Sequence, residues 1–144
     1  MKVIDPKIKA LEERLQRLEI ISLQLESYEK FQSAVDLKDI AERNLQVAIE
    51  MCLDIGKILI SQKKLSEPKD NKGIFVVLAE AGIISHESLS FMVPMAGTRN
   101  ILVHGYDKID DSLIYGILKK HLKDFRKFMG QVRGPHTPPA PLVR

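Results

Sequence analysis

The residues best suited to chemistry lie in one segment, Arg99-Asn100-Ile101-Leu102-Val103-His104-Gly105-Tyr106-Asp107. An imidazole exchanges protons near neutral pH and can act as a general acid or a general base. A guanidinium can hold a phosphate through paired hydrogen bonds and stabilise the negative charge that develops on its oxygens. Arg99 and His104 are therefore suited to RNA cleavage, in which the histidine takes the 2′-hydroxyl proton or protonates the leaving oxygen.

The spacing of Arg99 and His104 limits how they can act together. Residues five apart on a regular α-helix are separated by about 140° around its axis. Both side chains reach one phosphate only if the helix end unwinds, which Gly105 permits, or if two copies of the chain meet across a symmetric interface. In such a dimer one histidine can be the base and its mate the acid. Alternatively, a histidine at a helix C-terminus can simply be a favourable partner of the helix dipole.

Apolar residues recur at three- and four-residue steps along most of the chain, which predicts an all-α protein. We expect helices over 6–32, about 36–61, 73–81, 85–104, and from about 111 through Phe128. Long helices joined by short loops predict an antiparallel bundle of four to five helices over residues 1–132. The proline-rich segment 133–144 is expected to be a disordered tail.

Several residues predict where these helices begin, end or bend. Asp5 and Asp36 are suited to cap the first two helices at their N-termini. Gly82 can close the third helix, and Gly105 offers a left-handed exit from the fourth. Pro94 should kink or split the fourth helix, because proline lacks the N–H donor and clashes with the preceding turn.

The composition is that of an ordinary soluble globular protein, with 44% hydrophobic and 28% charged residues. Aromatic residues make up only 6%, which argues against a stacking platform for bases. The single cysteine, Cys52, lies among apolar neighbours and is expected to be a buried hydrophobe. No Cys/His spacing predicts a zinc site, so no metal or other cofactor is expected. The charged N-terminus, with neither signal peptide nor membrane span, predicts a cytoplasmic protein.

The positive charge is concentrated near the C-terminus. The net charge is only +3, yet six cations fall within fifteen residues: Lys119, Lys120, Lys123, Arg126, Lys127 and Arg133. A basic helix face of this kind can attract a polyanion, or it can be the solvated side of a helix.

The segment 99–107 resembles the Arg-x4-His-x-Tyr signature of the HepT-like toxins, a branch of the HEPN superfamily. The flanking blocks Cys52-Leu53-Asp54-Ile55-Gly56 and Leu78-Ala79-Glu80-Ala81-Gly82-Ile83-Ile84-Ser85 resemble that family too. The resemblance implies a helical bundle that dimerises and brings two copies of the signature together in a cleft. It also implies a metal-independent endoribonuclease toxin that cuts RNA, with tRNA as one candidate substrate.

The same resemblance implies roles for four residues. Arg99 and His104 match the family's catalytic pair, and Asn100 matches the polar residue beside the arginine. Tyr106 matches the tyrosine to which an MntA-type nucleotidyltransferase antitoxin adds AMP. Negative charge beside His104 would block RNA entry and repel phosphate. The implied partners are RNA, this antitoxin and a second copy of the chain, with a larger assembly with the antitoxin also open and no membrane.

Two other functions remain open at this point. The chain can be a non-catalytic partner subunit of a nucleotidyltransferase, in which Arg99 and His104 bind a nucleotide phosphate or help bind the substrate. It can also be a plain dimerisation bundle, in which both residues contribute only to stability.

Overall fold

The computed structural model describes residues 3–105 and 109–134. These residues form seven α-helices and one short 3₁₀ helix, with no strand among them. The elements are α1 (Asp5–Gln24), α2 (Tyr28–Ser33), α3 (Val35–Gln62), α4 (Asn71–Glu80), η1 (His86–Ser88), α5 (Leu89–His104), α6 (Asp111–Lys120) and α7 (Leu122–Arg133). The predicted all-α class is confirmed. The chain has more helices than expected because two of the predicted helices are each divided in two.

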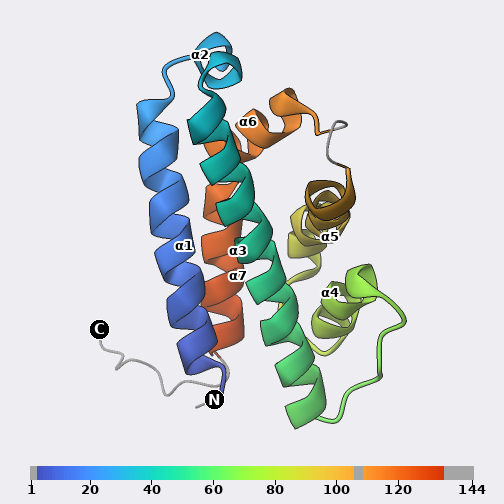
Figure 1. The fold of residues 1–144 in the computed structure, drawn as a ribbon. Coiled ribbons are helices and arrows are strands. Elements are labelled where there is room, and N and C mark those ends of the chain that lie inside the picture. Colours follow the sequence, from blue (N-terminus) through green and yellow to red (C-terminus); the bar gives the residue numbers. More distant parts are fainter. Residues whose placement is uncertain (1–2, 106–108, 135–144) are drawn as a thin grey trace.

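The helix expected over residues 6–32 is interrupted after α1. Leu25 is extended and buried, and the Ser27 hydroxyl accepts a hydrogen bond from the backbone N–H of Lys30 at 3.1 Å. Serine at this position starts a new helix by satisfying a free backbone donor. The chain therefore turns at residues 25–27, and α2 covers the end of the bundle (Figure 1).

The last predicted helix is also divided, at His121. Asp110 caps α6, since its carboxylate accepts from the backbone N–H of Ser112 at 2.9 Å. His121 leaves helical geometry, with φ −121° and ψ 3°, and its ring Nδ1 lies 2.9 Å from Asp124 Oδ2. Because of this break, α6 crosses the end of the bundle while α7 runs along α1 (Figure 1).

The remaining predicted helix ends agree with the structure to different degrees. Gly82 follows α4 with φ +77°, as expected for a closing glycine. Neither aspartate is the predicted N-cap: Asp5 is the first residue of α1, and Asp36 lies inside the first turn of α3.

Pro94 does not split its helix, since α5 is helical from Leu89 to His104. Pro94 is exposed, so the missing N–H falls on the solvent side of the helix.

The core lies between α1, α3 and α7, and α4 and α5 pack on another side of α3 (Figure 1). Phe75 of α4 and Phe128 of α7 meet edge to face, with ring centroids 5.8 Å apart. Cys52 is fully buried, as predicted, and burial raises the pKa of its thiol. A Cβ on Gly56 would lie 2.5 Å from Ile74 Cγ2, so the glycine lets α4 approach α3 closely.

None of the helices in the described part of the chain has the length and apolar run that a membrane span needs.

Candidate functional site

The candidate site is built on α5, which carries Arg99, Asn100 and His104. Met92, Met95 and several small or apolar residues of α5 are buried against the neighbouring helices. The opposite side of α5 faces solvent. This packing fixes the rotation of the helix about its axis, and therefore the directions in which its polar residues point.

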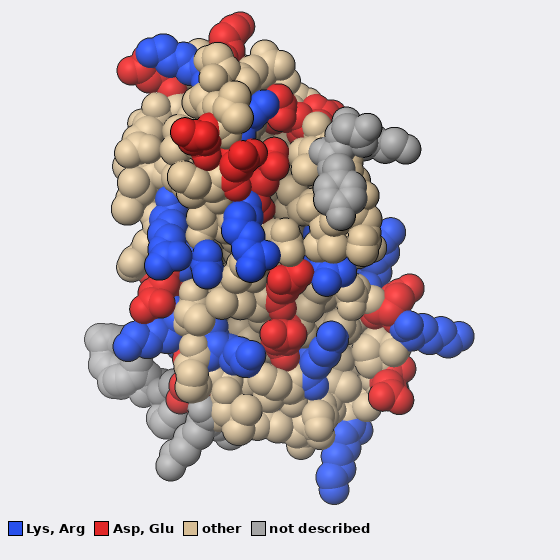
Figure 2. Space-filling view, in the orientation of Figure 1, with Lys and Arg blue, Asp and Glu red and all other residues tan. Residues whose placement is uncertain are grey.

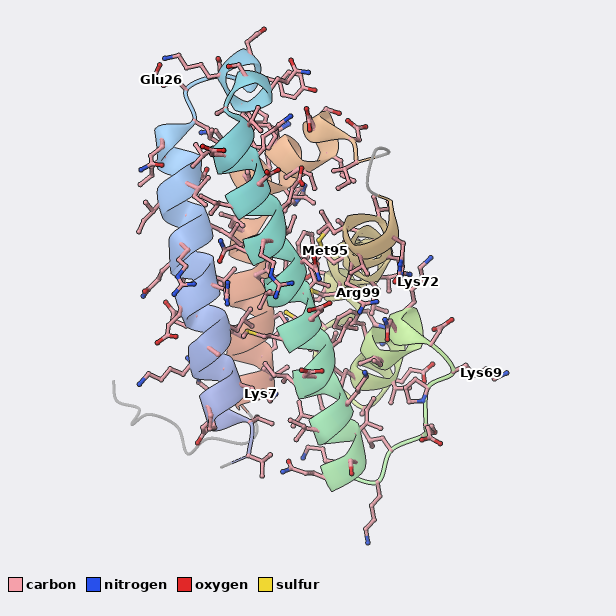
Figure 3. The ribbon with its side chains drawn as sticks, in the orientation of Figure 1. Lys7, Glu26, Lys69, Lys72, Met95 and Arg99 are labelled. Carbon is pink, nitrogen blue, oxygen red and sulfur yellow. The ribbon has the colours of Figure 1, made fainter. Side chains whose placement is uncertain are left out.

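Arg99 points toward α3 and forms an ion pair there. Its Nε donates to Glu50 Oε2 at 3.1 Å, and the two side chains are 28% and 32% exposed. Glu50 also accepts from Gln46 Nε2, one turn earlier on α3, at 3.3 Å. Figure 3 shows Arg99 where α5 approaches α3. Since Glu50 binds the Nε edge, the guanidinium keeps terminal N–H donors for another ligand.

Glu50 is a residue that sequence reasoning did not identify. The only sequence signal is its place on the polar flank of the α3 hydrophobic stripe, which it shares with many other charged residues. Its partner lies 49 positions away, so only the packing of α5 on α3 brings the two together.

His104 is the last residue of α5 and is exposed to solvent. The helix remains regular up to this point, because the Gly105 N–H donates to the Ile101 carbonyl at 2.7 Å. Gly105 has φ −94°, so the predicted left-handed exit is wrong. Its glycine is required for a different reason: a Cβ there would lie 2.6 Å from the Ile101 oxygen.

The geometry of α5 separates the two candidate catalytic side chains. Arg99 is half-buried against Glu50, whereas His104 faces solvent about 140° away around the helix. The unwinding that would let one chain aim both at a single phosphate does not occur within residues 99–105.

Of the other two predicted site residues, Asn100 and Tyr106, the structure describes only Asn100. Asn100 is exposed, and its Oδ1 lies 3.4 Å from Arg99 Nη1. It also lines a shallow hollow beside Lys72 of α4. Tyr106 lies outside the described residues.

Much of the basic stretch 119–133 is engaged in contacts within the fold. Arg126 binds two carboxylates of α1, Glu12 and Glu19, at 2.6–3.1 Å. Hydrogen bonding and attraction in this cluster lower the pKa of Glu12 and raise that of Arg126. Lys119 donates to the Ser22 carbonyl, and Lys127 pairs with Glu87 at 3.7 Å. These contacts favour a structural and solvated face over a separate polyanion site.

Comparison with known proteins identifies relatives over most of the chain. A family model described as "Ribonuclease HepT-like" matches residues 11–132. The mRNA nuclease HepT of Shewanella oneidensis is 29% identical over 104 residues, covering 72% of this chain and 78% of the relative. The tRNA nuclease HepT of Aphanizomenon flos-aquae is 28% identical over 124 residues, covering 81% and 84%.

A solved structure agrees with these matches. It is the tri-AMPylated HEPN toxin of Shewanella oneidensis in complex with MNT antitoxin, and the TM-score is 0.83 at 26% identity. The match covers 92% of this chain and 98% of that one. The HEPN-like fold and the HepT-like resemblance predicted from the sequence are thereby confirmed. Since the family model spans most of its 144 residues, the chain belongs to the ribonuclease HepT-like family.

Proposed function

We propose that this chain is the toxin of a toxin–antitoxin pair and cleaves RNA without a metal ion, using Arg99 and His104. The observation that carries the proposal is the arrangement on α5. A guanidinium is held at 3.1 Å by Glu50 with donors to spare, and an exposed imidazole ends the same helix. Two HepT relatives are named as nucleases of mRNA and of tRNA, so the substrate class is RNA.

The proposed active site lies between two copies of the chain. Because α5 stays helical through His104, a second copy is needed to bring another imidazole to the phosphate. Ile101 lies one turn before His104 and is 39% exposed, so it is accessible to a second chain on the same side of α5. A two-fold contact along this face would bury Ile101 and place the two His104 side chains near each other.

The reaction follows from these groups. One His104 imidazole takes the proton from the 2′-hydroxyl, whose oxygen attacks the adjacent phosphorus. The bond from phosphorus to the 5′-oxygen breaks, and the partner's His104, as imidazolium, protonates that oxygen. Arg99 binds the non-bridging oxygens and stabilises their developing charge. The products are a 2′,3′-cyclic phosphate and a 5′-hydroxyl.

A cleavage assay tests the catalytic assignment. Purified chain should cut tRNA or mRNA in the presence of EDTA, and His104→Ala and Arg99→Ala should each slow cleavage by about 10²-fold or more. His121→Ala is the matched control, since His121 is an exposed histidine at the junction of α6 and α7, where its ring contacts Asp124 and stacks on Phe91. Cleavage by His104→Ala at the wild-type rate would refute the assignment.

The dimer is tested by a charge placed on the exposed face of α5. Ile101→Glu should give a monomer by light scattering and should lose cleavage. Leu23→Glu is the control, because Leu23 is 85% exposed at the end of α1. A wild-type chain that is monomeric and still cuts RNA would contradict a shared site.

We further propose that an MNT-type nucleotidyltransferase neutralises the toxin by adding AMP to Tyr106. The related Shewanella toxin is tri-AMPylated in complex with MNT antitoxin, and Tyr106 follows His104 by two residues. Phosphates at that position would compete with RNA phosphate for Arg99 and His104. After co-expression with the antitoxin, the intact mass should rise in steps of AMP. Tyr106→Phe should abolish the increase and Tyr115→Phe should not; the opposite pattern would place the modification elsewhere.

A further inference from the structure

A hollow of about 390 Å³ adjoins the candidate site where α4 begins. Asn100 and Ala96 of α5 form one wall, and Asp70, Asn71 and Lys72 form the other. The Lys72 side chain extends across this hollow, since its Cε lies 3.9 Å from the position of a Cβ on Gly97. Figure 3 shows Lys72 and Arg99 in the region where α4, α5 and α3 come together.

A second hollow, of about 590 Å³, lies next to the first. Asp70 and Asn71 line both hollows, so both border the start of α4. The second hollow lies between the end of α3 and the loop 63–70, and three lysines border it: Lys57, Lys64 and Lys69. Blue side chains stand out around this loop in Figure 2, and Lys69 extends from it into solvent in Figure 3.

The four lysines along these hollows have no anionic partner within the described residues. Lys57, Lys64, Lys69 and Lys72 are all exposed and form no ion pair there, unlike Arg126 and Lys127 in the basic stretch. Two carboxylates border the hollows, from Glu67 and Asp70. Asp70 already accepts the Gly73 N–H at 2.8 Å as the cap of α4. The hollows that begin at Asn100 therefore carry a net positive charge, and the four lysine ammonium groups face solvent.

We propose that the two hollows form one track for the phosphates of single-stranded RNA that flank the cleaved bond. This inference rests on the proposed function, because the track begins beside Arg99 and Asn100. A polyanion that neutralises these lysines releases condensed counterions, which favours binding. The walls of the track carry aliphatic residues such as Ile60, Leu65 and Ile74 and no aromatic ring. Because phosphate contacts carry no sequence information, binding along the track is tolerant of base sequence.

The test measures the salt dependence of RNA binding by the full-length chain. The probe is a 2′-O-methyl oligomer of about 16 nucleotides, which exceeds most single-strand footprints and lacks the nucleophile for cleavage. The track variant combines Lys57→Gln, Lys64→Gln and Lys69→Gln. The matched control combines Lys9→Gln, Lys120→Gln and Lys123→Gln, which removes three exposed lysines that also lack ion pairs within the described residues.

The expected result is a smaller dependence of affinity on salt in the track variant alone. Each phosphate contact contributes about 0.7 to the slope of log K against log salt for single strands, so the slope should fall by about 2. Lys72→Gln alone should lower it by about 0.7. The loss should be equal for oligomers of different base sequence.

The outcomes separate this inference from the proposed function. Equal slopes for wild type and track variant, equal losses in both triple variants, or a wild type that does not bind the probe would each overturn the track. Cleavage of unmodified RNA is measured separately on the wild-type chain. Salt-dependent binding through the track without any cleavage would leave the track standing and refute the nuclease.

Discussion

Removal of the Glu50 carboxylate tests whether the contact with α3 positions Arg99 for cleavage. A charge-assisted hydrogen bond contributes about 1.5–3 kcal/mol when buried. Since about 30% of each side chain is exposed, we reduce this to about 1 kcal/mol. Without Glu50, Arg99 would sample several rotamers. The transition state would lose about 1 kcal/mol, which corresponds to about a fivefold lower kcat.

The Glu50 variants should have a distinctive kinetic signature. In Glu50→Ala, kcat should fall about fivefold while KM stays equal or decreases, because a carboxylate that competes with the RNA phosphate is removed. Glu50→Gln keeps a neutral acceptor for the Arg99 Nε and should recover most of kcat. A loss of stability alone would not produce this separation of kcat from KM.

The assay is steady-state cleavage of a labelled RNA in EDTA, with urea unfolding to confirm that each variant is folded. Asp54→Ala is the matched control, since Asp54 lies one turn further along α3 and pairs with Lys7 rather than with α5. The reasoning is wrong if Glu50→Ala cleaves as fast as wild type, if KM rises instead, or if Asp54→Ala slows cleavage equally.

Three further predictions concern the scaffold. Gly105→Ala should distort the end of α5, because its Cβ would meet a backbone oxygen at 2.6 Å, and should slow cleavage by about tenfold; wild-type rates would contradict this. In thermal unfolding, Gly56→Ala should cost about 1–3 kcal/mol by overpacking, whereas Gly130→Ala, with nothing within 4 Å, should stabilise by about 0.5–1 kcal/mol. Arg126→Met should lower the free energy of unfolding by about 1 kcal/mol at neutral pH. That difference should shrink in urea titrations as the pH falls below the ordinary carboxyl range. A carboxyl whose pKa is lowered by folding stabilises the fold above its unfolded pKa and loses this effect as the pH falls through the folded value. A difference that persists at low pH would show that Arg126 acts through packing instead.

The sequence predicted the helical class and most of the core because apolar periodicity depends only on local spacing. It did not predict the breaks at residues 25–27 and at His121, since the hydrophobic stripes continue on both sides of each break. The chain turns there because the ends of the helices must fold back onto the bundle, and Ser27 and Asp124 provide the local hydrogen bonds. Pro94 shows the reverse: a residue expected to kink or split a helix lies inside the continuous α5, on an exposed face where the missing donor is tolerated.

The candidate site was predictable only in part, for a similar reason. Arg99, Asn100 and His104 are close in sequence and lie on one helix, so a short motif identifies them. Glu50 and Lys72 come from α3 and α4, and their proximity to the motif depends on how three helices pack. The ion pairs that engage much of the basic stretch 119–133 depend on packing in the same way, because Glu12 and Glu19 lie more than 100 residues from Arg126.

The most direct test of the central claim is the chemistry of the RNA ends that the purified chain produces in EDTA. If His104 activates the 2′-hydroxyl while Arg99 stabilises the phosphate, every product carries a 2′,3′-cyclic phosphate or a 5′-hydroxyl, and His104→Ala forms these products at least about 10²-fold more slowly. Products with 5′-phosphates, or cleavage that requires a divalent cation, would contradict the account.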